Sequence, residues 1–223
     1  AMYLGFGSDI VLRDRKAVEV AQALDMRQFH LRVLKSKFDR VDIDGSGTLD
    51  AQELFESVGE SRSPLTDKLF ELLELAPNGT VEFDDYVRIL GTFCMFTKEE
   101  ILRFCFRCFD HDDSGTIDEK EFCELCKVVN NASPMFPGNF ARALDEFDVN
   151  EDGLIDYMEF VELDRRYPLI LFPAFRLQDM MQKKTLGESA WVGLSEKYYH
   201  NKQIEDYKAS HGGKLPPEPI VTR

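Results

Sequence analysis

The sequence predicts an all-α protein made of two lobes, each built from two paired helix-loop-helix hands with a short β ribbon between the loops. An additional helix is expected at the N-terminus and a helical extension at the C-terminus. Three stretches of twelve residues, which begin at Asp42, Asp110 and Asp148, carry oxygen-bearing side chains at alternate positions. The second and third begin 38 residues apart, which is typical of a repeated helical unit.

The oxygen pattern of these three loops matches the needs of a calcium ion. Calcium takes about 6–8 oxygens, which a twelve-residue loop supplies from positions 1, 3, 5, 7 (a backbone carbonyl), 9 (through water) and 12 (a bidentate carboxylate). Gly47, Gly115 and Gly153 stand at position 6, where the chain must reverse. The predicted ligands of three Ca²⁺ sites are Asp42, Asp44, Ser46, Thr48, Asp50 and Glu53; Asp110, Asp112, Ser114, Thr116, Asp118 and Glu121; and Asp148, Asn150, Asp152, Leu154, Asp156 and Glu159.

A fourth hand is expected between the first and second loops, because 68 residues separate their starting points. Asn78, Gly79, Val81 and Asp85 would stand at positions 5, 6, 8 and 12. Glu74, Ala76 and Pro77 at positions 1, 3 and 4 break the ligand pattern, so this loop is predicted to bind no calcium. Its expected role is structural: Val81 would pair with Leu49 across a short ribbon, as Ile155 would with Ile117.

Residues from about 26 to 166 resemble the calmodulin superfamily of four EF-hand proteins, on the evidence of these loops and their pairing. The resemblance implies a regulator that changes shape with calcium and grips an amphipathic helix of a target protein. The silent fourth hand, which lies second along the chain, and the extensions depart from calmodulin. They look more like dedicated calcium sensors and calcineurin B-like regulatory subunits.

The expected organisation has five parts. Residues 1–25 form an N-terminal extension with a helix within 9–24, and 26–92 form the N-lobe. Residues 93–167 form the C-lobe, 168–207 a helical extension and 208–223 a disordered tail. Local signals mark helix starts: Ser63-Pro64 in the first lobe, and a capping box of Thr97 and Glu100 in the second. Phe29, Val33 and Phe38 are expected on one side of the helix that precedes the first loop.

Charge and hydropathy narrow the range of partners. The net charge is −14, which argues against nucleic acid and anionic membrane surfaces and favours a basic amphipathic helix as the target. The apolar run Leu169–Phe172 is far shorter than the roughly 20 residues that a membrane-spanning helix needs, so no membrane insertion is expected. The first residues lack a secretory pattern, so we expect a cytoplasmic protein, with cytoskeletal or flagellar association as a further option.

Four of the five cysteines form two C-x-x-C pairs with a spacing close to that of a zinc site. These pairs, Cys105/Cys108 and Cys123/Cys126, flank the second calcium loop on two helices and alternate with phenylalanines. We therefore interpret them as reduced thiols in the core, with zinc as the alternative.

The C-terminal extension carries several large apolar residues, among them Phe172, Phe175, Met181 and Trp191. Their spacing predicts that residues 172–199 fold back as an intramolecular ligand for the groove of the C-lobe. The alternative is a terminal helix packed on the outside of the domain.

The leading functional hypothesis is a calcium-dependent sensor or regulatory subunit. The alternative is a structural EF-hand component of a cytoskeletal or flagellar assembly, in which the ions only rigidify a scaffold. The four histidines are scattered along the chain, which argues against a catalytic site, and no enzyme activity is expected.

Overall fold

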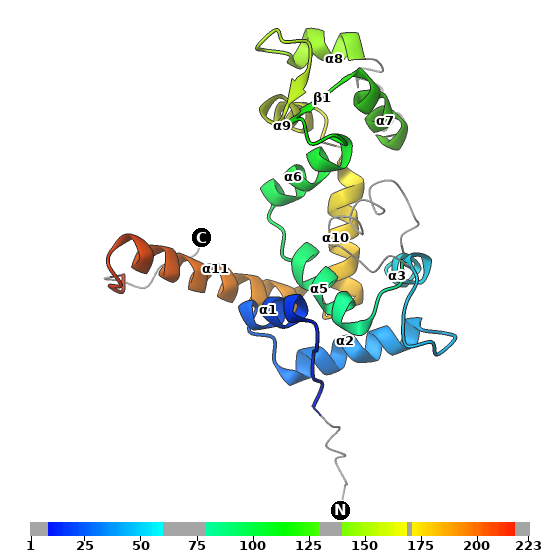
Figure 1. Cartoon of the computed structure of the whole chain (residues 1–223), viewed down its shortest axis with the longest axis vertical. Coiled ribbons are helices and arrows are strands. Elements are labelled where there is room, and N and C mark those ends of the chain that lie inside the picture. The colour runs from blue at the N-terminus through cyan, green and yellow to red at the C-terminus, as the bar shows by residue number, and fades with distance from the viewer. Residues whose placement is uncertain (1–8, 60–78, 130–139, 169–170, 217–223) are drawn as a thin grey trace, which may run out of the picture. The chain divides into compact units, whose positions relative to one another are not determined.

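The computed structural model describes residues 9–59, 79–129, 140–168 and 171–216, and within them the chain is mostly helical (Figure 1). The helices are α1 (Arg15–Ala23), α2 (Gln28–Val41), α3 (Ala51–Ser57), α5 (Phe83–Phe93), α6 (Lys98–Phe109), α7 (Glu119–Val129), α8 (Phe140–Phe147), α9 (Tyr157–Arg166), α10 (Phe172–Lys184) and α11 (Glu188–Ser210). Two short strands, β1 (Thr116–Ile117) and β2 (Ile155–Asp156), complete it. The predicted all-α fold class is confirmed.

Some sequence-based expectations fall outside this range. They are the helix start at Ser63-Pro64, positions 1 to 5 of the fourth loop (Glu74–Asn78) and the last part of the tail, residues 217–223. Within the described ranges, no helix is both long and apolar enough to cross a bilayer.

The chain divides into two compact units. The first contains the described residues 9–58, 79–95 and 180–216, and the second contains 96–129, 140–168 and 171–179. Each unit holds one pair of loops. In the second, β1 and β2 pair antiparallel with Ile117 opposite Ile155. In the first, Leu49 and Val81 exchange two backbone hydrogen bonds of 2.9 and 2.7 Å, as the sequence predicts.

Capping residues explain where several helices begin. The predicted capping box of α6 is present: the Glu100 amide donates to Thr97 Oγ1 at 3.2 Å, and the Thr97 amide donates to Glu100 Oε2 at 2.7 Å. The same device starts α3 and α9, where the acid at loop position 9 is the N-cap and the glutamate at position 12 is its partner. The predicted calcium ligands therefore also fix the start of each outgoing helix.

Phenylalanines fill the core of each unit. In the first, the Phe38 ring lies edge-on to Phe83 at 5.6 Å and to Tyr86 at 5.5 Å between centroids. In the second, Phe106 packs edge-on against Phe160 at 5.4 Å. These contacts join the helices on either side of the loops, so the loops are held by a rigid frame.

The predicted apolar face of α2 is incorrect for two of the three residues assigned to it. Phe29 is 57% exposed and Val33 is 40% exposed, whereas Phe38 is buried. The face that packs is made of His30, Leu31, Leu34 and Phe38. Phe29 and Val33 lie on the neighbouring stripe of the helix, because residues four apart share a face and 29 and 33 are out of register with 34 and 38.

The C-terminal extension departs from the predicted docking on the C-lobe in its second part, because residues 171–179 lie in the second unit but the residues after them do not. Residues 180–199 belong to the first unit: Gln182 Nε2 donates to the Cys94 carbonyl at 2.7 Å, and the Tyr199 hydroxyl donates to the Met95 carbonyl at 3.1 Å. These carbonyls follow the last residue of α5, where a helix leaves acceptors unsatisfied. Donors from α10 and α11 supply the missing hydrogen bonds.

The tail also differs from expectation, because α11 continues to Ser210 although the sequence predicts disorder from Lys208. The Gly213 amide donates to the Lys208 carbonyl at 2.8 Å, and Gly212 and Gly213 both have positive φ. Glycines in this conformation end the helix by satisfying its last carbonyls.

Candidate metal centre

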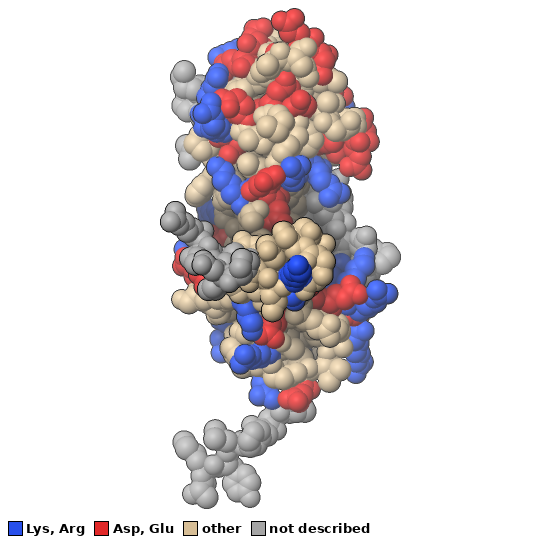
Figure 2. Space-filling view, turned by 90° about the vertical axis from the view of Figure 1, so that its left-hand side faces the viewer, with Lys and Arg blue, Asp and Glu red and all other residues tan. Residues whose placement is uncertain are grey.

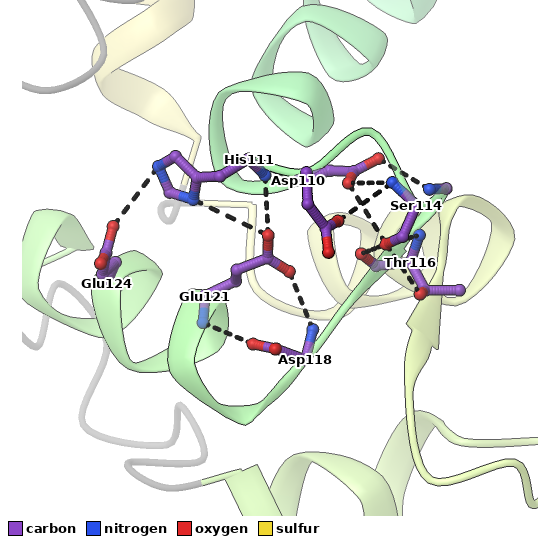
Figure 3. A network of polar contacts seen from close by, with 9 residues as sticks. Asp110, His111, Ser114, Thr116, Asp118, Glu121 and Glu124 are labelled. Atoms are coloured by element: carbon purple, nitrogen blue, oxygen red, sulfur yellow. Dashed lines mark hydrogen bonds and ion pairs between the residues drawn. The ribbon is translucent and has the colours of Figure 1, made fainter.

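The loop from Asp110 to Glu121 brings three carboxylates together (Figure 3). Ligand oxygens of Asp110, Asp112 and Glu121 all lie within 4.8 Å of one another. Asp110 is fixed by two loop amides: Ser114 donates to Oδ1 at 2.9 Å and Gly115 to Oδ2 at 3.0 Å. Gly115 has a φ of +83°, the left-handed conformation that lets the chain reverse around a central point.

Glu121 closes the same loop from the first turn of α7. Its Oε1 accepts from the His111 amide at 2.7 Å, and its Oε2 accepts from the Asp118 amide at 3.1 Å. In return, Asp118 Oδ1 accepts from the Glu121 amide at 2.9 Å. The carboxylate at position 12 is thus held by amides from both ends of the loop, in the place that a bidentate calcium ligand occupies.

Burial strengthens the case for a cation here. Asp110 is 4% exposed and Glu121 is 6% exposed. In the described part of the chain, no lysine or arginine forms an ion pair with either carboxylate, and the nearest basic group is His111, whose Nδ1 lies 3.8 Å from Glu121 Oε1. Buried carboxylates without a cationic partner are costly unless a metal compensates them. An all-oxygen donor set of this kind suits a hard cation such as Ca²⁺.

The loop from Asp148 to Glu159 repeats this arrangement. Asp148 Oδ2 accepts from Gly153 at 2.9 Å. Glu159 Oε1 accepts from the Val149 amide at 2.8 Å, and Oε2 accepts from Asp156 at 2.9 Å. The Asn150 side chain takes the place of an aspartate, and its Oδ1 accepts from the Asp152 amide at 3.0 Å. The same hydrogen-bond framework therefore presents the predicted ligands of this loop.

The loop from Asp42 to Glu53 is less closed. Asp42 receives the amides of Ser46 and Gly47, each at 2.9 Å, and Glu53 Oε2 accepts from Asp50 at 3.0 Å. Among the residues that the structure describes, no hydrogen bond joins Glu53 to the amide of Ile43, the counterpart of the closing bonds in the other two loops. Only the second loop gathers three acidic ligands within 4.8 Å in the described ranges.

Hydrogen bonds also link the predicted ligands at positions 5 and 7 in two of the loops. The Ser46 hydroxyl donates to the Thr48 carbonyl at 2.8 Å, and the Ser114 hydroxyl donates to the Thr116 carbonyl at 3.1 Å, so positions 5 and 7 are adjacent in both loops. The Ser46 amide lowers the pKa of Asp44, and the Ser114 hydroxyl and amide lower the pKa of Asp112. These hydrogen bonds favour the ionised form of both aspartates, which is the form that binds calcium.

Sequence reasoning missed the backbone amides at position 2, which belong to His111 and Val149. Their closing bonds to Glu121 and Glu159 come from the main chain. Any residue type except proline offers such an amide, so no side-chain signal in the sequence could have revealed them.

The fourth loop uses its acids for other contacts. Asp85, at position 12, accepts from Arg88 Nη2 at 2.9 Å and from the Glu82 amide at 3.3 Å. Asp84 accepts from two amides that precede α1. Gly79 keeps the positive φ of the turn, and Val81 keeps its bridge to Leu49. The loop retains its structural features while its described carboxylates serve the protein itself.

The cysteine interpretation needs one correction. Cys105 and Cys108 on α6 are buried, but Cys123 on α7 is exposed, while the side chain of Cys126 lies outside the described part of the structure. The buried face of α7 contains Phe122 and Leu125, and Cys123 points away from it. In the described residues, no cysteine joins a group of three or more metal-ligating side chains.

We predict that thiol reactivity follows this burial. Burial raises the pKa of the Cys94 and Cys105 thiols well above its usual range, so the reactive thiolate is scarce at neutral pH. Modification with a thiol reagent, mapped by mass spectrometry, should label Cys123 at least about tenfold faster than Cys105. Equal rates for Cys123 and Cys105 in the native protein would contradict the packing of α6.

Comparison with known proteins agrees with this geometry. Residues 31–91 match the EF-hand domain pair family, 101–131 an EF-hand domain, and 140–164 a further EF hand. The chain belongs to the calmodulin superfamily of EF-hand proteins. The predicted resemblance is confirmed, and the EF-hand domains imply Ca²⁺ binding.

Curated relatives of this EF-hand protein include B subunits of calcineurin and a protein kinase. It is 28% identical to the calcineurin B protein of Candida glabrata over 131 residues, which is 57% of this chain and 75% of that protein. It is 29% identical to the calcineurin B protein of Yarrowia lipolytica over 131 residues, 57% of this chain and 76% of that one. A calcium and calcium/calmodulin-dependent serine/threonine-protein kinase of Lilium longiflorum is 26% identical over 160 residues, 69% of this chain but 31% of the kinase. The chain is thus a calcium-binding regulatory EF-hand protein similar to the calcineurin B family.

Proposed function

We propose that this EF-hand protein is a non-catalytic calcium sensor that binds three Ca²⁺ ions and then grips a basic amphipathic helix of a protein target. The observation that carries the proposal is the cluster of three carboxylates from Asp110, Asp112 and Glu121. Asp110 and Glu121 are buried, and within the described residues neither has a lysine or arginine partner. A cation bound by these three carboxylates would neutralise their charge and so change the stability of the loop and helices that hold them. The free thiols of the described cysteines favour a reducing compartment such as the cytoplasm.

The character of the target follows from charge. In sequence, residues 96–179 contain 19 acidic and 9 basic residues. Figure 2 shows acidic side chains gathered over the end of the second unit that carries α7, α8 and α9. Such a surface attracts a basic partner and speeds its association. The curated relatives named as calcineurin subunits support a role as the regulatory part of a larger assembly.

The proposed stoichiometry can be measured directly. Isothermal calorimetry of chelator-stripped protein should find three Ca²⁺ ions per chain, with dissociation constants of about 10⁻⁷–10⁻⁵ M. The less closed loop at Asp42–Glu53 should be the weakest of the three. Four sites would contradict the silent fourth loop, and two would remove one of the proposed ligand sets.

Exposure of apolar surface separates a sensor from a scaffold. Binding of an apolar fluorescent dye should rise on addition of Ca²⁺, because sensor hands open and present a hydrophobic groove. Mg²⁺ at equal concentration and ionic strength is the control, because this smaller ion demands octahedral geometry and keeps several waters, so it takes fewer ligands from the loop. Unchanged dye fluorescence with Ca²⁺ bound would favour the structural role.

A further inference from the structure

Helix α1 lies against α5, and this is the most extensive pairing between described helices of the first unit (Figure 1). Its core-facing residues are small or aliphatic: Ala17, Ala21 and Leu24 are buried. Opposite them, α5 carries Gly91. A Cβ atom at Gly91 would lie 2.4 Å from Val20 Cγ1 and 3.3 Å from Leu24 Cδ1, so α1 sits closer than any side chain there would allow.

A second contact fixes the start of α1. Asp84, in the first turn of α5, accepts through Oδ2 from the amides of Arg13 at 2.5 Å and Asp14 at 2.6 Å. Asp14 in turn caps α1 by accepting from the Ala17 amide at 2.7 Å. Amides at a helix start have no acceptor within the helix. Asp84, at position 11 of the silent loop and outside the usual ligand positions, supplies this acceptor for α1.

Helix α1 has the character of a target helix that a pair of EF hands binds. Its apolar residues face α5, while Arg15, Lys16 and Glu19 are exposed, with Arg13 just before it. An amphipathic helix with a basic start, laid by its apolar side against a helix of a hand pair, is the helix-in-groove mode of recognition. The segment just after α1 also contacts α11, because Lys197 of α11 forms an ion pair with Asp25.

We propose that α1 is a built-in helical ligand of the first hand pair, latched by Asp84 and seated on Gly91, which excludes other amphipathic helices from this face of α5. The inference goes beyond the proposed function, with which it shares the premise that the hand pairs bind helices. None of the α1 contacts described above involves a predicted calcium ligand. The test of this proposal is therefore run both with Ca²⁺ and with chelator. The α1 result can then be interpreted even if calcium-dependent target binding fails.

The test releases α1 in the full chain without altering α5. The double variant Ala17→Glu/Ala21→Glu places two charges in the α1–α5 interface. A fluorescently labelled peptide of residues 9–26 should then bind the variant, with a saturable rise in anisotropy, at least about tenfold more tightly than it binds the unaltered chain, whose site is occupied. The matched control is Gln22→Glu/Ala23→Glu, which adds the same two charges at exposed positions of α1 and should bind no better than the unaltered chain. A labelled peptide carrying the two interface glutamates should not bind either protein.

A milder variant covers the case in which the double variant does not fold. Asp84→Ala removes the latch and leaves the apolar contacts. Hydrogen exchange of its full chain should show at least about tenfold faster exchange of amides in residues 15–24, while α2 and α5 keep their protection. The proposal is overturned if α1, α2 and α5 lose protection together in Asp84→Ala. It is also overturned if a folded Ala17→Glu/Ala21→Glu chain fails to bind the peptide.

Discussion

Replacing Glu121 with glutamine should weaken calcium binding at the second loop by about 100-fold, or about 2.7 kcal/mol, while the other two sites keep their affinity. Glutamine has the same length but offers one oxygen where Glu121 offers two. Both carboxylate oxygens accept loop amides, from His111 and Asp118. The amide NH₂ of the variant would face one of these donors, so the loop would lose a ligand charge and a closing bond together.

The measurement is a calorimetric or competitive-chelator titration of Glu121→Gln beside Glu124→Gln. Glu124 is a matched control: it lies about one turn further along α7, outside the twelve-residue loop, and pairs with His111 Nε2 at 3.4 Å. Glu124→Gln should leave all three sites nearly unchanged. If Glu121→Gln retains full affinity at every site, the register of the second loop is wrong.

Replacing Trp191 with alanine should lower the free energy of unfolding by about 3–5 kcal/mol. Trp191 is 1% exposed, and its indole Nε1 donates to Thr185 Oγ1 at 3.0 Å. Thr185 is itself buried and donates to the Met181 carbonyl at 2.6 Å. The variant would leave a cavity of ring size and deprive Thr185 of a partner, at the turn that joins α10 to α11.

Chemical denaturation followed by circular dichroism, in the presence of a chelator, measures this change without a contribution from calcium binding. Val192→Ala is the control, because the neighbouring side chain is 48% exposed and its loss should change stability by no more than about 0.5 kcal/mol. A loss below about 1 kcal/mol for Trp191→Ala would mean that the C-terminal helices are not integral to the first unit.

The calcium loops could be predicted from the sequence because their determinants are local. Asp110, Gly115 and Glu121 lie within twelve residues, and the bonds that order them run between near neighbours. The same holds for the Thr97–Glu100 capping box. The pairing of Leu49 with Val81 followed from the repeat itself, since both stand at position 8 of their loops.

The sequence by itself therefore determined the helix-loop-helix repeat, the side chains that we propose as ligands and the loss of this ligand pattern in the fourth loop. Tertiary structure decided which faces the helices bury and where the extensions lie. Whether Phe29 or Leu34 faces inward depends on the helix opposite. The places of the end of α10 and of α11 depend on the carbonyls of Cys94 and Met95, which are 88 and 104 residues away in sequence from their donors Gln182 and Tyr199. Asp84 could equally have been a solvated loop acid until α1 brought two unpaired amides to it. Contacts of this kind join groups that are distant in sequence, so the local pattern carries no record of them.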